Sequence, residues 1–114
     1  MYRQGDVLIV PVTQTAVPQA VLAAGPPPRA PRERMVLALG ESTGHAHAVV
    51  ATHDEGDFYP APAEADPAFL FLPRGGKVVH EEHGTIALPE GWYRVVRQRE
   101  YEPRALRSFR MVAD

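Results

Sequence analysis

The chain has 114 residues, of which 45% are hydrophobic and 23% are charged, and its formal net charge is −2. This length is that of one domain, and the weak charge gives no general attraction to nucleic acid or to an anionic membrane. The sequence contains no cysteine, which excludes disulfides, thiolate metal ligands and a cysteine nucleophile. We find no signal-peptide pattern and no run long enough to span a bilayer, so we expect a cytoplasmic protein without a membrane partner.

Twelve prolines and nine glycines are spread along the chain and divide it into short pieces. This pattern favours a small all-β fold with many turns over a fold of long helices. We therefore predict that residues 1–114 form a single-domain β-barrel or β-sandwich.

The first expected strand is Val7–Val12, an apolar and mostly β-branched run. Pro11 must lie at an edge or a bulge of the sheet, because proline donates no hydrogen bond to a ladder. Residues 13–34 are rich in proline and alanine and are interpreted as a loop or arm, with a helical turn at Ala20–Ala24. This segment is either a solvated connection, a lid over a site, or an arm that reaches a partner chain.

The later strands are short and are separated by turn residues. We expect them at Met35–Leu39, His45–Thr52, Asp57–Tyr59, Ala68–Leu72, Lys77–His80, Gly84–Leu88 and Trp92–Tyr101. Pro89-Glu90-Gly91 is a turn in which proline fixes φ and glycine takes a positive φ. It should join Ile86–Leu88 to the last strand as a hairpin.

His45 and His47 form the first of two histidine pairs. Alternate residues of a strand share one face, so both imidazoles can reach a single ligand. Neutral imidazole is the commonest side-chain ligand of transition metals. An HxH pattern alone is a weak signal for a metal site.

His80 and His83 form the second pair, and they converge only if the chain turns after His80. Glu81 and Glu82 lie between them and are candidates for a metal ligand, an acceptor of an imidazole N–H, or a general base. The alternative interpretation is a polar turn with two surface histidines. His53 lies outside both pairs and is expected in an exposed loop.

We predict that a β-fold brings the two pairs together. The predicted ligands of a divalent metal ion (Zn, Fe, Mn or Ni) are His45, His47, His80 and His83. Glu81 and Glu82 are the candidate catalytic residues, for example beside a metal-bound water. A small-molecule ligand, or a hydrogen-bonded histidine cluster without metal, is the alternative.

Two segments resemble the motifs of cupins. Residues 40–47 (GESTGHAH) are similar to the glycine-led HxH motif, and residues 73–80 (PRGGKVVH) are similar to the second motif. The resemblance implies a small cupin-like β-barrel in which His45, His47 and His80 are inward-facing metal ligands. Cupins carry a glutamate after the HxH, and this chain does not, so the fourth ligand would be His83, Glu81, Glu82 or water.

A second resemblance covers more of the chain. The segments TGHAH, HEEHG and LPEGWYRVVRQREYEP, within residues 40–114, are similar to a family of small uncharacterised bacterial and phage proteins. The resemblance implies that both histidine motifs and the QREY segment are parts of the same family pattern. It implies no activity.

An alternative function rests on the last strand. Arg97 and Arg99 share a face with Tyr93 and Tyr101, and basic residues among aromatics on a sheet can bind single-stranded nucleic acid. This face could instead hold a protein partner in a non-catalytic binding module. The acidic residues 54–66 could also meet the arginine-rich end, either in the same molecule or in a homodimer.

Overall fold

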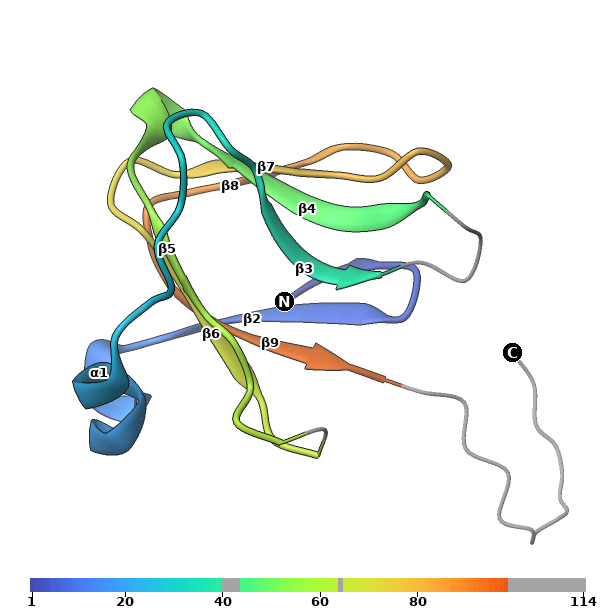
Figure 1. The fold of residues 1–114 in the computed structure, drawn as a ribbon. Coiled ribbons are helices and arrows are strands. Elements are labelled where there is room, and N and C mark those ends of the chain that lie inside the picture. Colours follow the sequence, from blue (N-terminus) through green and yellow to red (C-terminus); the bar gives the residue numbers. More distant parts are fainter. Residues whose placement is uncertain (40–43, 64, 99–114) are drawn as a thin grey trace, which may run out of the picture.

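Two antiparallel sheets face each other in the computed structural model, which describes residues 1–39, 44–63 and 65–98 (Figure 1). The five-stranded sheet has the order β1-β2-β9-β6-β5, and the four-stranded sheet has the order β3-β4-β7-β8. The strands are β1 (Tyr2–Gln4), β2 (Val7–Val12), β3 (Met35–Leu39), β4 (Ala46–Ala51), β5 (Asp57–Tyr59), β6 (Ala68–Leu72), β7 (Gly76–Val79), β8 (Ile86–Leu88) and β9 (Gly91–Arg97). The prediction of an all-β fold is confirmed, as a sandwich without a closed barrel in the described ranges.

The apolar runs of the sequence become these strands. Most strand ends lie within two residues of the predicted ends. The predicted strand to Tyr101 is described only as far as Arg97, and its remainder from residue 99 lies outside the described residues. Pro11 is tolerated because β1 pairs with β2 only as far as Tyr2↔Ile9, which leaves the Pro11 end of β2 without a neighbour on that side.

The predicted hairpin between Ile86–Leu88 and the last strand is wrong. β8 pairs with β7, and β9 lies between β2 and β6 in the other sheet. The longer apolar strands β2 and β6 pair with the two edges of β9, so β9 has no free edge for β8. Pro89-Glu90-Gly91 therefore carries the chain from one sheet to the other, and the Tyr93 hydroxyl donates a 2.6 Å hydrogen bond back to the Pro89 carbonyl.

The main core lies between the sheets and follows the period-2 alternation of the strands. Its largest fully buried side chains come from both sheets: Val7, Ile9, Val49, Leu70, Leu72 and Val78. Because Val49 points inward, His47, two residues earlier on β4, lies on the same inner face. The fold thus carries one histidine into the end of the core.

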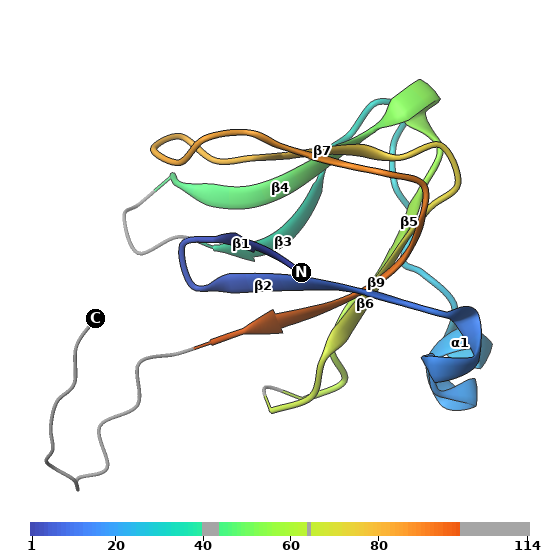
Figure 2. The same cartoon turned by 180° about the vertical axis from the view of Figure 1, so that it is seen from behind.

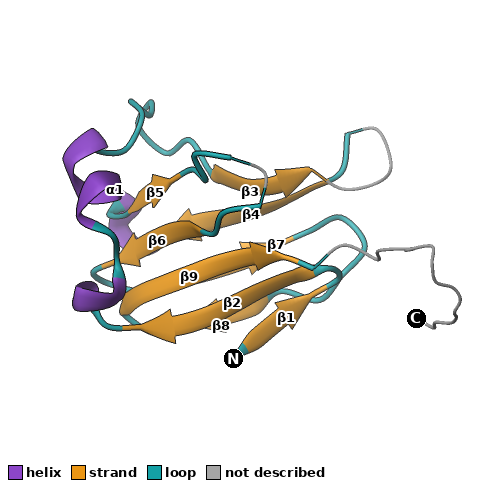
Figure 3. Ribbon diagram, turned by 90° about the horizontal axis from the view of Figure 1, so that it is seen from below, coloured by secondary structure: helices purple, strands orange, loops and turns teal. Residues whose placement is uncertain are grey.

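The first part of residues 13–34 packs against the outer face of the five-stranded sheet through Val17, Val21 and Leu22. This part contains a 3-10 turn (Gln14–Ala16) and the helix α1 (Gln19–Ala24), which matches the expected helical turn. Val17 is buried there with Tyr59 and Phe69. Figures 2 and 3 show α1 at the end of the sandwich opposite the β1–β2 turn and the β7–β8 loop. This helix therefore does not form a lid over the second histidine pair.

The described part of the chain contains no helix that is both long and apolar enough to cross a membrane.

Because Tyr93 is buried in the core, the burial of its phenol can be tested by measuring the stability of the protein at alkaline pH. The side chain is 2% exposed, and burial raises the pKa of its phenol to about 12, whereas an unfolded tyrosine titrates near pH 10. Between these values the unfolded state has lost a proton that the folded state keeps. The stability that neutral Tyr93 contributes is complete below about pH 10 and is lost as the pH rises through the folded pKa.

The free energy of unfolding, measured with urea, should fall between about pH 9 and about pH 12. In Tyr93→Phe this fall with pH should be smaller by about 2 kcal/mol than in the unchanged protein. An equal alkaline loss in both proteins would show that Tyr93 is not titrating from the core.

Candidate functional site

The candidate site lies at one end of the sandwich, where the β1–β2 turn, the start of β4 and the β7–β8 loop come together (Figure 2). His45 immediately precedes β4 and His47 lies within it. β7 ends at Val79, so His80 follows the strand directly and His83 lies in the bend before β8. The turn after His80 that the sequence analysis required is present.

The four histidines of the two pairs meet at this end. The centre of the His80 ring is 4.3 Å from that of His47, 4.6 Å from that of His83 and 5.6 Å from that of His45. His80 therefore touches members of both pairs. His53 lies in an exposed turn with a φ of 59°, as expected. Metal ligation by the four clustered histidines remains a prediction.

Gln4 on β1 holds His47 in place, and both side chains are 3% exposed. The Gln4 amide nitrogen donates to the carbonyl oxygens of Val78 (3.2 Å) and Gly84 (2.9 Å). Its amide oxygen lies 2.9 Å from His47 Nδ1 and can only accept, so Nδ1 carries the proton. The Nε2 atom of neutral His47 therefore has the free lone pair.

Asp6, in the β1–β2 turn, faces that lone pair. Its Oδ1 lies 3.7 Å from His47 Nε2, and its Oδ2 accepts a 2.8 Å hydrogen bond from Arg97 Nε. Partial burial acts to raise the pKa of Asp6, but the hydrogen bond and charge of Arg97 outweigh it and the pKa is lowered. Burial, followed by the charge of His80, lowers the pKa of His47. Both shifts favour a neutral imidazole beside a carboxylate.

The two glutamates of the β7–β8 loop have different contacts. Glu81 Oε1 accepts a 3.0 Å hydrogen bond from the backbone N–H of Ala46, and this bond lowers the pKa of the Glu81 carboxyl. Glu82 Oε2 lies 3.5 Å from His45 Nδ1. The backbone N–H of Glu82 donates to His80 Nδ1 at 3.0 Å, so Nε2 carries the proton of neutral His80.

Three side chains of the cluster offer donors close enough for one metal ion. One ligand atom each of His45, His80 and Glu81 lies within 4.8 Å of the other two. Tetrahedral zinc with ligand distances of about 2.0–2.2 Å holds its donors about 3.3–3.6 Å apart, so the three donors would have to come closer together to bind one ion. We call His45, His80 and Glu81 the three-donor group. It combines two of the predicted metal ligands with a glutamate that was predicted as catalytic.

The predicted Arg/Tyr face is not an exposed surface where the structure describes it. Tyr93 is buried in the core, and Arg97 is bonded to Asp6. Arg99 and Tyr101 lie outside the described residues. In the acidic loop, Asp54 pairs with Arg29 rather than with the arginine-rich end. These contacts remove the described half of the surface on which the alternative binding module was based.

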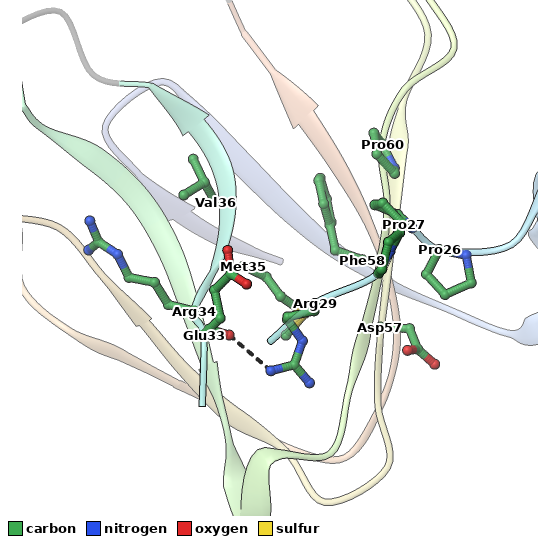
Figure 4. Close-up of a pocket in the computed structure, with 11 residues that line it drawn as sticks. Pro26, Pro27, Arg29, Glu33, Arg34, Met35, Val36, Asp57, Phe58 and Pro60 are labelled. Atoms are coloured by element: carbon green, nitrogen blue, oxygen red, sulfur yellow. Dashed lines mark hydrogen bonds between the residues drawn. The ribbon is translucent and has the colours of Figure 1, made fainter. Parts of the chain in front are cut away.

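A hollow of about 630 Å³ lies away from the clustered histidines, between the proline-rich segment, β3 and β5 (Figure 4). Its wall includes Pro26, Phe58 and Met35. Arg29 lines it too, but the Arg29 guanidinium is engaged by Asp54 and by the Glu33 carbonyl. The hollow presents more apolar than polar surface, and its wall also carries the charged side chains of Glu33, Arg34 and Asp57.

Sequence reasoning missed Gln4 and Asp6. Neither belongs to a motif, and both act through contacts with residues more than 40 positions away. The only signal available was the position of Gln4 and Asp6 on either side of Gly5, which does not reveal what this part of the chain packs against.

The sequence model of a family described as a domain of unknown function (DUF8820) matches residues 3–98. The chain belongs to this family. Searches of curated proteins and of solved structures gave no match. The matched range of this DUF8820 domain runs from β1 through β9 and contains every residue of the candidate site. The expectation of an uncharacterised family is thus confirmed, while its bacterial and phage origin stays a prediction.

Gln4→Ala tests whether this side chain holds the end of the sandwich together. The change leaves the buried carbonyl of Val78, the part-buried carbonyl of Gly84 and one imidazole N–H without their partner, so we expect a loss of about 2–4 kcal/mol in the free energy of unfolding. Gln98→Ala is the matched control, because Gln98 is exposed and its side chain bonds only to Arg3 among the described residues. Chemical denaturation of both variants measures the difference, and equal small losses would contradict the assigned role.

Proposed function

We propose that this DUF8820 domain binds a divalent transition-metal ion through His45, His80 and Glu81. The observation that carries the proposal is the approach of three donor atoms to within 4.8 Å of one another, from two segments that the fold alone brings together. Two imidazoles and a carboxylate form a donor set that holds zinc with one position open. Iron, nickel and manganese remain the other candidates.

The surrounding contacts suit this role. If His45 binds metal through Nε2, its Nδ1–H points toward Glu82, which would orient the imidazole as a carboxylate partner does in many zinc sites. The hydrogen bond from Ala46 holds Glu81 close to the strand that carries His47. Glu82 is therefore assigned a positioning role, and Glu81 the role of a ligand.

The open position defines what the site could do. A bound divalent ion would supply a Lewis acid there, able to polarise an oxygen of a small molecule or to activate a water. The cupin resemblance offers a different set, His45, His47 and His80. The proposal replaces His47 with Glu81 because the tight group of donors contains Glu81 and not His47. The alternative binding module has less support, because on the described part of the Arg/Tyr face Tyr93 is buried and Arg97 is paired with Asp6.

The proposal is tested by zinc binding to protein purified without a histidine tag. His45→Ala and His80→Ala should each weaken zinc binding by at least about tenfold, since even changes to residues that only orient a ligand cost about 10- to 100-fold. A chromophoric chelator in competition with the protein measures the affinity.

His53→Ala is the control, because His53 is an exposed histidine outside the cluster. It should leave zinc affinity unchanged, and circular dichroism should show that all variants remain folded. Zinc affinity that is equal in all three variants would contradict the proposed site.

A further inference from the structure

Another hollow, of about 360 Å³, lies between the two sheets on the side of their edge strands β3 and β5. Its floor is the inner face of the five-stranded sheet at Val7 and Val95, and β3 borders it from Val36 to Leu39 (Figure 1). Phe58 on β5 forms part of its wall. We call this space the inter-sheet hollow.

We propose that the inter-sheet hollow binds a small molecule that carries an apolar chain and a carboxylate group. This binding site goes beyond the proposed metal binding and does not depend on a bound ion.

The wall of the inter-sheet hollow suits an apolar chain. Its side chains are apolar except for Asp66 and Arg97. Val36 and Leu39, on the bordering strand, are 42% and 66% exposed although both are large apolar residues. An apolar chain that lies against them removes this surface from water, which favours binding.

Arg97 provides the charge that a carboxylate requires. Its side chain alternates along β9 with the buried Tyr93 and Val95, so it faces the space between the sheets. Arg97 Nε donates to Asp6 Oδ2, but among the described residues no hydrogen bond reaches either Nη atom. The two Nη atoms of a guanidinium match the two oxygens of a carboxylate. Because Asp6 already holds the guanidinium in place, less freedom is lost when a ligand binds.

Asp66 indicates which carboxylates to test. Ala68 on β6 lies opposite Val95 on β9, and continuing this antiparallel register by two residues brings Asp66 level with Arg97. The carboxylate that pairs with Arg97 is nevertheless that of Asp6. An ammonium group beside the carboxylate of the ligand, as in an α-amino acid, would lie toward Asp66. The test therefore compares a carboxylate with and without an α-amino group.

The inter-sheet hollow adjoins the histidine cluster. Asp6 connects them, because one of its oxygens accepts from Arg97 and the other lies 3.7 Å from His47 Nε2. A ligand held by Arg97 is therefore a neighbour of the cluster.

Nuclear magnetic resonance titration tests the proposal. Untagged full-length protein is stripped of metal with chelator and titrated with hexanoate, norleucine or hexan-1-ol, which have carbon chains of equal length. We expect hexanoate or norleucine to give saturable shifts in the backbone signals of residues 36–39 and 95–97, with a dissociation constant of about 1 mM or lower. Hexan-1-ol should bind at least about tenfold more weakly, because it has no charge for Arg97.

Arg97→Gln should weaken binding of the acid by at least about tenfold, because the charged donors are lost. Arg94→Gln is its matched control, since Arg94 is exposed on the opposite face of the same strand, and it should leave the affinity unchanged. Circular dichroism shows whether the variants remain folded.

A second pair of variants keeps Asp6 and Arg97 intact. Ala61→Phe places a larger side chain in the wall of the inter-sheet hollow and should also weaken binding. Ala63→Phe is its control, because Ala63 is an exposed residue of the same loop that does not line the hollow.

The site is overturned by the absence of saturable shifts with both acids, or by equal affinity for hexanoate and hexan-1-ol. Unchanged affinity in a folded Arg97→Gln or in Ala61→Phe overturns it as well. Tighter binding of norleucine than of hexanoate supports the site and assigns Asp66 to the ammonium group, and the reverse order supports it through the carboxylate alone. Because every titration uses metal-free protein, a failure here leaves the proposed metal site standing.

Discussion

The side-chain amide of Gln4 is the interaction on which this end of the molecule depends. Gln4 belongs to the five-stranded sheet, but its amide nitrogen donates to the carbonyls of Val78 on β7 and Gly84 in the β7–β8 loop, both in the other sheet. Its oxygen accepts from His47 on β4. One buried side chain thus joins the sheets, anchors the loop that carries His80 and His83, and sets the tautomer of the histidine that enters the core.

The same hydrogen bonds determine how the site must respond to a metal ion. His47 already presents Nε2, so its ring needs no change of tautomer. His80 differs, because its Nδ1 accepts the backbone N–H of Glu82 and its Nε2 carries the proton. Coordination through either nitrogen of His80 displaces that hydrogen bond. The proposed metal binding would therefore be coupled to a rearrangement of the loop around Glu82, whereas the strand that carries His47 can stay fixed.

Local patterns of the sequence predicted most of the strands, and the alternation at His45 and His47 predicted a shared face. Such patterns report what a segment buries, not which strand it pairs with. The pairing of β8 with β7 instead of β9 was missed because it depends on β2 and β6 occupying both edges of β9. Gln4 and Asp6 were missed for the same reason, since only distant contacts give them a role. The choice between Glu81 as ligand and as base needed the position of its carboxylate beside the histidines.

The central claim is that two distant histidine pairs form one metal-binding cluster, and imidazole NMR tests it most directly. Long-range ¹⁵N–¹H spectra of histidine-labelled protein, recorded before and after zinc is added, report the tautomer and coordination of every imidazole in one sample. The account predicts that the signals of His45 and His80, one from each pair, take the shifts of metal-bound imidazoles while that of His53 does not change. Changes confined to one pair, or a change at His53 equal to the others, would contradict it.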